Sequence, residues 1–107
     1  MKIINRGFIC VTPTPLFIAW AAKHSDENQF FTINPEPSIY LVEDDFWEDS
    51  KVIEKYYKKI SKQEFNALST KDEIIPIISS EEEFYLYFDL NVGTIVNDLL
   101  KENIERE

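Results

Sequence analysis

Glycine is nearly absent from this chain of 107 residues, in which Gly7 and Gly93 are the only two. Phosphate-binding loops and dinucleotide-binding turns need several closely spaced glycines, because their backbone turns tightly and approaches the phosphate. The sharp turn that carries the nucleophile of many hydrolases also needs flanking glycines. The sequence therefore excludes these three kinds of active site.

Cysteine and histidine each occur once, as Cys10 and His24. A single cysteine forms no internal disulfide, which favours a reducing compartment, and we expect a cytoplasmic protein. Cys10 lies in the apolar run GFICVT, which favours a buried and unreactive thiol. His24 falls where a helix is expected to end, where a cation interacts favourably with the helix dipole. Catalysis by His24, paired with Cys10 or a serine, is the alternative to these structural roles.

The sequence has no apolar run long enough to cross a membrane as a helix. The first 23 residues have a basic start, an apolar stretch and an Ala19-Trp20-Ala21 triplet, which are features of secretory signals. Pro13 and Pro15 interrupt the apolar stretch, so we interpret it as a strand followed by a helix. We expect no signal segment here and no membrane contact.

Positive charge is scarce, with 11 Lys and Arg against 20 Asp and Glu and a net charge of −9. This charge repels the phosphates of nucleic acids and anionic lipid headgroups, so we expect neither as a partner. It favours solubility and speeds the approach of a basic protein. Hydrophobic residues make up 44% of the chain, which is typical of a folded protein, and the length predicts one domain over residues 1–107.

Strand-like and helix-like segments alternate along the first part of the chain. Gly7–Thr12 and Ser38–Glu43 are rich in β-branched and aromatic residues, which predicts two strands. Thr14 suits the cap of a helix that follows the first strand, and Pro15 suits its first position. This helix is apolar on nearly every side, so we expect it to be well buried.

Two further helices are predicted in the second half. The longer one covers residues 50–68, where apolar residues recur at helical spacing and five lysines lie largely off the apolar stripe. The stripe comprises Val52, Ile53, Tyr56, Tyr57, Ile60, Phe65 and Leu68, and the lysines are Lys51, Lys55, Lys58, Lys59 and Lys62. The shorter one begins at a capping box formed by Ser80 and Glu83, and it directs Phe84, Tyr87 and Phe88 inward.

The segment NVGTIVNDL near the end fits either a strand or a helix, because its apolar residues also continue at helical spacing toward Ile104. We predict a strand to about Leu99, followed by a charged tail. The predicted order is then β-α-β-α-α-β. Three strands are too few to be covered on both faces, so the predicted fold class is α+β, a small three-stranded sheet with about three helices packed on one side.

Several segments together resemble a family of small acidic bacterial proteins without an assigned function. They are RGF followed by TPTPLFIAW, then EPSIYLVE, EFNAL, IIP and FDLNVGTIVNDL. Most are apolar anchors of strands and helices, spread over most of the chain. The resemblance implies a stand-alone domain of this fold and brings no catalytic motif. Ile75 precedes Pro76 where the related sequences tend to have Trp.

The stretch EDDFWEDS places two large aromatic residues among five acids. These are Glu43, Asp44, Asp45, Phe46, Trp47, Glu48 and Asp49. The stretch does not resemble a calcium loop, because it has no glycine for the sharp turn and the aromatics occupy its middle. We predict no metal site here, nor one formed by His24 with Asp26 and Glu27.

Two interpretations of this stretch remain open. In one it only connects the second strand to the long helix: Asp49 or Ser50 caps the helix, and Phe46 or Trp47 folds back onto the core. In the other, Trp47 is exposed within an acidic rim and anchors a basic protein, because exposed Trp is enriched in binding hot spots and the acids steer approach.

The sequence by itself does not define the biochemical role. We predict a non-catalytic interaction domain without a cofactor, and an inhibitor or immunity-type protein for a basic partner is the specific hypothesis. The alternative is a small enzyme or ligand-binding domain that uses carboxylates clustered near His24. Homo-oligomerisation through an unpaired sheet edge is neither demanded nor forbidden.

Overall fold

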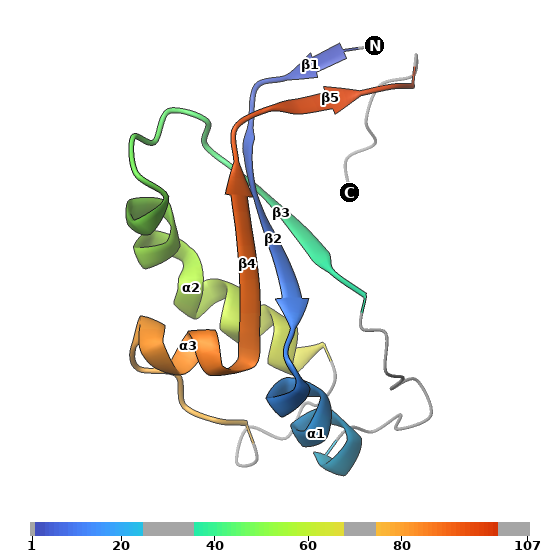
Figure 1. Cartoon of the computed structure of the whole chain (residues 1–107), viewed down its shortest axis with the longest axis vertical. Coiled ribbons are helices and arrows are strands. Elements are labelled where there is room, and N and C mark those ends of the chain that lie inside the picture. Colours follow the sequence, from blue (N-terminus) through green and yellow to red (C-terminus); the bar gives the residue numbers. More distant parts are fainter. Residues whose placement is uncertain (1, 25–35, 68–74, 101–107) are drawn as a thin grey trace.

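The computed structural model describes residues 2–24, 36–67 and 75–100 (Figure 1). Its elements are β1 (Lys2–Ile4), β2 (Gly7–Pro13), α1 (Pro15–His24), β3 (Ser38–Val42), α2 (Asp49–Asn66), α3 (Glu81–Tyr87), β4 (Phe88–Gly93) and β5 (Val96–Asp98). β3, β2 and β4 form an antiparallel sheet in that order, and β1 pairs with β5. The α+β class is confirmed and one sheet has three strands as predicted, but the second, two-stranded sheet was not predicted. The order is therefore β-β-α-β-α-α-β-β rather than β-α-β-α-α-β.

The two-stranded sheet continues the β2–β4 pair beyond an interruption (Figure 1). Ile4 pairs with Val96, and Phe8 pairs with Gly93. Between these two pairs, the chain from β1 to β2 has three residues (5–7), and the chain from β4 to β5 has two (94–95). One extra residue on one strand is the signature of a β-bulge, which locally breaks the ladder and bends the strand. β1 was missed because its three residues are too few to show alternation.

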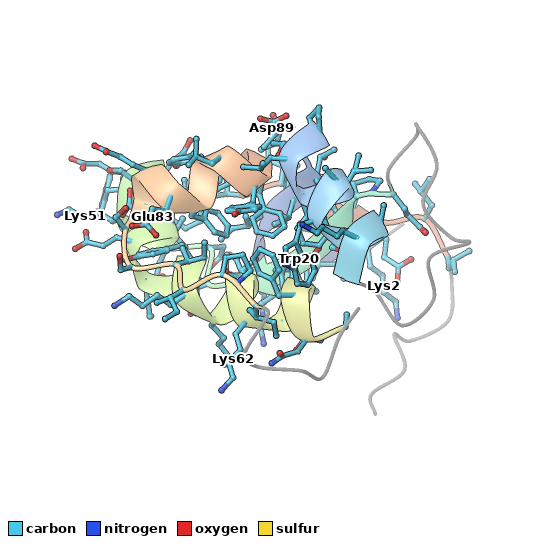
Figure 2. The ribbon with its side chains drawn as sticks, turned by 90° about the horizontal axis from the view of Figure 1, so that it is seen from below. Lys2, Trp20, Lys51, Lys62, Glu83 and Asp89 are labelled. Atoms are coloured by element: carbon cyan, nitrogen blue, oxygen red, sulfur yellow. The ribbon has the colours of Figure 1, made fainter. Side chains whose placement is uncertain are left out.

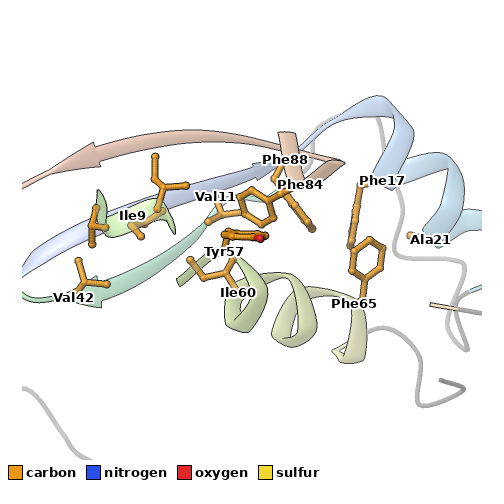
Figure 3. Packing of buried hydrophobic residues seen from close by; sticks show 12 residues of the cluster. Ile9, Val11, Phe17, Ala21, Val42, Tyr57, Ile60, Phe65, Phe84 and Phe88 are labelled. Atoms are coloured by element: carbon orange, nitrogen blue, oxygen red, sulfur yellow. The ribbon is translucent and has the colours of Figure 1, made fainter. Parts of the chain in front are cut away.

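α2 lies against the sheet face that carries Ile9 and Val11, both fully buried (Figure 3). Its buried residues are Val52, Ile53, Tyr57, Ile60, Ser61 and Phe65. The predicted apolar stripe is therefore confirmed, except that Tyr56 is half-buried and Leu68 lies outside the described residues. All five predicted lysines are exposed, and Figure 2 shows Lys51 and Lys62 pointing away from the body of the molecule.

An aromatic cluster around Phe65 joins α2 to the other two helices and to β4. The ring centroid of Phe65 lies 4.7 Å from that of Trp20, 5.1 Å from Phe17, 5.3 Å from Tyr87 and 5.7 Å from Phe88. Trp20, labelled in Figure 2, is half-buried and packs against the core. Tilted and edge-on ring pairs at these distances stabilise a core beyond their buried area.

Only one side of α1 is buried, which corrects the expectation of an all-round buried helix. Phe17 and Ala21 belong to the core, whereas Leu16 is 46% exposed. Thr14 does precede the helix, and its carbonyl accepts the first helical hydrogen bond from Ile18. Its hydroxyl donates to the carbonyl oxygen of Leu86, which ties the start of α1 to α3.

The predicted cap of α3 at Ser80 is confirmed, but the return bond of the capping box goes to Ser79 instead of Ser80. The Ser80 hydroxyl accepts a hydrogen bond from the backbone N–H of Glu83 at 3.2 Å, and the Glu83 carboxylate reaches back to Ser79. The helix ends at Tyr87, however, and Phe88 is the first residue of β4 rather than a helical residue. The terminal segment is a strand as predicted, but it begins earlier and is divided into β4 and β5.

Candidate functional site

The acidic loop, defined as Glu43–Asp49, leads from the end of β3 into the first residue of α2. Its first side chain is held by α2. The Lys55 ammonium donates to one carboxylate oxygen of Glu43 at 2.7 Å, and the Tyr56 hydroxyl donates to the other at 2.6 Å. These hydrogen bonds, that from Lys55 above all, favour the charged carboxylate and lower the pKa of Glu43 to about 2.

Phe46 fixes the middle of the acidic loop. Its ring is half-buried and packs against the hydrophobic core. Gly7 makes room for it: a Cβ at that position would stand 2.8 Å from a ring carbon of Phe46 and 2.7 Å from the carbonyl oxygen of Glu43. Gly7 is thus required by the close approach of the loop to β2. Sequence reasoning did not connect Gly7 with the loop.

Trp47 is 99% exposed, the most exposed large hydrophobic side chain among the described residues. Asp44, Asp45, Glu48 and Asp49 are also exposed. The structure therefore combines parts of both interpretations of the loop. Phe46 folds back onto the core, as in a connection, while Trp47 stands in solvent beside acids, as in a docking surface.

The expected side-chain cap of α2 is not formed. The N-cap residue is Glu48 in an extended conformation, and its side chain makes no capping hydrogen bond. Neither Asp49 nor Ser50 is the cap, because both already lie inside the helix. Asp49 lies in the first turn instead, where its negative charge faces the positive end of the helix dipole. The exposed acids of the loop are thus left available to solvent.

Two cations stand next to one side of the acidic loop. A shallow hollow of about 650 Å³ is lined by Asn5, Arg6, Leu41, Val42, Glu43, Asp44, Asp45, Lys55 and Tyr56. Arg6 and Lys55 partly balance the first three acids of the loop there. Glu48 and Asp49 do not line this hollow, and both are exposed beside Trp47.

A second hollow of about 550 Å³ lies between β3 and α2. At one end the Tyr40 and Ser38 hydroxyls donate to the carboxylate of Glu64, the Ser38 bond measuring 3.4 Å. Burial of Tyr40, together with its bond to Glu64, raises the pKa of its hydroxyl above the usual range. Sequence reasoning missed this site, although Tyr56, Ile60 and Glu64 recur at the four-residue spacing of one helix face.

The alternative site around His24 falls largely outside the described residues. α1 does end at His24, as predicted, but its side chain and the residues Asp26 and Glu27 are not described. In the described ranges, no three His, Cys, Asp or Glu side chains are grouped so as to hold a metal ion. Cys10 is half-buried rather than fully buried. No helix among the described residues is long and apolar enough to span a membrane.

Comparison with protein families, curated proteins and solved structures finds no match for this chain. The resemblance to a family of small acidic bacterial proteins stays a prediction.

Proposed function

We propose that this protein is a non-catalytic docking domain that binds a basic protein through the acidic loop, in the manner of an inhibitor or immunity protein. The observation that carries the proposal is the 99% exposure of Trp47 directly after the packed side chain of Phe46. Exposing the large apolar surface of Trp to water is unfavourable in free energy, and burying it is favourable. Contact with a partner recovers that free energy.

The structure supports a preorganised loop. Glu43 is clamped by Lys55 and Tyr56, and Phe46 is packed over Gly7. A loop that is already ordered loses less conformational entropy on binding than a free one. These contacts hold the chain just before Trp47, and α2 begins two residues after it at Asp49.

The charge of the loop supports a basic partner. Glu48 and Asp49 lie beside Trp47 without lining the hollow that contains Arg6 and Lys55. The net charge of −9 attracts a cationic protein from a distance, and the acids of the loop orient it during the final approach. An apolar anchor within a charged rim is the arrangement of a typical binding hot spot.

The test is capture of partners from a lysate of the source cells, followed by measurement of affinity with the purified partner. Three baits are compared: wild type, Trp47→Ala, and Ile77→Ala as the matched control. Ile77 is another apolar side chain, 87% exposed and outside the loop. We expect a basic protein to be retained by the wild type and the control. With Trp47→Ala its Kd rises about 30- to 1,000-fold, the range for loss of a hot-spot side chain.

Substitution of Asp44 and Asp45 with Asn removes their charge and leaves Trp47 in place. It therefore separates electrostatic steering by the acids from anchoring by Trp47. We expect the association rate to fall and its dependence on salt to weaken, with a smaller change in the dissociation rate. Retention of the same proteins by all three baits, or of none, would show that the acidic loop is not a docking surface.

A further inference from the structure

The hollow between β3 and α2 runs along the outer edge of the sheet. β3 pairs with β2 on one side, and among the described residues the sheet order places it at an edge (Figure 1). All five residues of Ser38–Val42 line the hollow. Because successive side chains of a strand point to opposite faces, a hollow that contacts five consecutive residues follows the backbone edge. The opposite wall is one face of α2, formed by Tyr56, Lys59, Ile60, Gln63, Glu64 and Ala67.

We infer that an extended peptide segment of a protein partner binds here as a fourth strand, hydrogen-bonded to the outer edge of β3 and enclosed by α2. An edge strand presents unpaired N–H and C=O groups at every second residue, and strand addition satisfies them. Five residues of β3 give a contact length of about 17 Å. This site does not involve Trp47, so the inference stands apart from the proposed docking role of the acidic loop.

Glu64 determines what the peptide places inside the groove. Its carboxylate accepts hydrogen bonds from Tyr40 and Ser38, and an ionised carboxylate has about four acceptor positions. The remaining positions suit a Lys or Arg side chain of the peptide, which would form a charge-assisted hydrogen bond. Lys59, exposed on the groove wall, favours a polar or acidic residue at a neighbouring inward position.

The sheet face that points away from α2 determines which residues the peptide needs at its outward positions. Ile39 and Leu41 point away from α2, beside Cys10 and Phe8 of β2, and they are 59% and 50% exposed. A strand added next to β3 would pair its outward side chains with these two residues. Apolar and β-branched side chains form the favourable cross-strand pairs at such positions. The expected peptide therefore alternates apolar residues with polar or basic ones.

The charges at both ends of β3 favour a basic segment and disfavour a second copy of this chain. Glu36 precedes the strand, and Asp44 and Asp45 follow it, whereas Glu43 is already paired with Lys55. Full antiparallel pairing of β3 with β3 of another copy is centred on Tyr40 and places Glu36 of each copy opposite Asp44 of the other. Like charges directly opposite each other destabilise a strand pair, and each copy carries a net charge of −9.

The experiment selects peptides from a phage-displayed library of random short sequences on the immobilised wild-type protein. Variants that block the groove are used for counter-selection. Gln63→Trp fills the groove from the α2 wall, and Lys51→Trp is the matched control, because Lys51 is exposed on the same helix but does not line the groove. Equal melting temperatures of the two variants show that both fold.

We expect selected peptides that alternate apolar with polar residues and carry a Lys or Arg at one inward position, and no measurable binding of the synthetic peptide to Gln63→Trp. Binding to Lys51→Trp and Trp47→Ala should equal that of the wild type. Glu64→Gln should weaken it about 10- to 150-fold, the range for hydrogen bonds to charged groups. Backbone amides of β3 should exchange with deuterium more slowly in the complex.

Three results overturn the inference: no enriched peptide, peptides that bind Gln63→Trp as well as wild type, or binding without slower amide exchange in β3. A dimer in sedimentation that is lost in Gln63→Trp also overturns it, because a second copy would then occupy the edge. Loss of peptide binding with Trp47→Ala would instead place the peptide on the acidic loop. The two proposals therefore fail independently.

Discussion

Replacement of Gly7 by Ala tests how the acidic loop is held against the sheet. A Cβ built at Gly7 lies 2.7 Å from the carbonyl oxygen of Glu43, 2.8 Å from a ring carbon of Phe46 and 3.1 Å from the carbonyl oxygen of Gly93. Two of these three atoms belong to the backbone, so they cannot move away by rotation of a side chain. The methyl group must therefore displace the loop or separate the strands.

Two opposing terms set the size of the effect. Overpacking a close contact costs about 1–3 kcal/mol. Ala also restricts the unfolded chain more than Gly, which stabilises a protein by about 0.4–1 kcal/mol where the backbone accepts it. The backbone at Gly7 accepts Ala, because neither glycine of the chain has a positive φ. We expect Gly7→Ala to lower the free energy of unfolding by about 1–2 kcal/mol.

Gly93→Ala provides the matched control. Its Cβ would lie 2.6 Å from a ring carbon of Phe8, closer than any contact at Gly7. The ring of Phe8 is a half-buried side chain and can rotate away. We therefore expect a cost below about 1 kcal/mol, despite the shorter distance.

Urea denaturation of the wild type and both variants measures these differences. The fluorescence of Trp20, whose ring packs against Phe65 and Phe17, reports loss of the core. In a domain of about 100 residues, each kcal/mol also lowers Tm by about 4–8 °C. If Gly7→Ala is as stable as the wild type, or costs less than Gly93→Ala, the close approach of the loop to β2 is wrong.

Three further outcomes follow from the same contacts. Phe65→Ala should reduce the free energy of unfolding by about 3–5 kcal/mol, since it removes the fully buried ring at the centre of the aromatic cluster. Thermal unfolding followed by circular dichroism measures this loss. A cost below about 1 kcal/mol would contradict the described core. Ser80→Ala should cost about 1 kcal/mol in urea denaturation, because α3 loses its cap, whereas Ser80→Gly should cost less. The carboxylate of Glu43, held by Lys55 and Tyr56, has a pKa lowered from 4.5 to about 2, so its stabilisation is present above pH 4.5 and is lost as the pH falls toward 2. The Tm difference between wild type and Glu43→Gln should shrink over that interval and with added salt, and a difference that is constant with pH would show that the carboxylate is not held as described.

Local sequence patterns were enough to predict those helices and strands in which the pattern extends over several turns or residues. α2 follows from an apolar stripe over many residues, and α3 begins at Ser80, whose hydroxyl caps the helix at Glu83. Phe88 was placed in the helix because its four-residue spacing from Phe84 satisfies helical periodicity. Its conformation is instead set by pairing with Pro13 on β2, a contact between residues far apart in the chain.

The sequence by itself determined the α+β class, the buried face of α2 and the lack of glycine-dependent sites, because these depend on composition and on periodicity within one element. Only the tertiary structure decided that Phe46 is packed over Gly7 while Trp47 stands in solvent, since adjacent residues of the same chemical type differ only in what the rest of the chain brings near them. The groove beside β3 also exists only in three dimensions, because its walls are two elements whose distance no local pattern encodes.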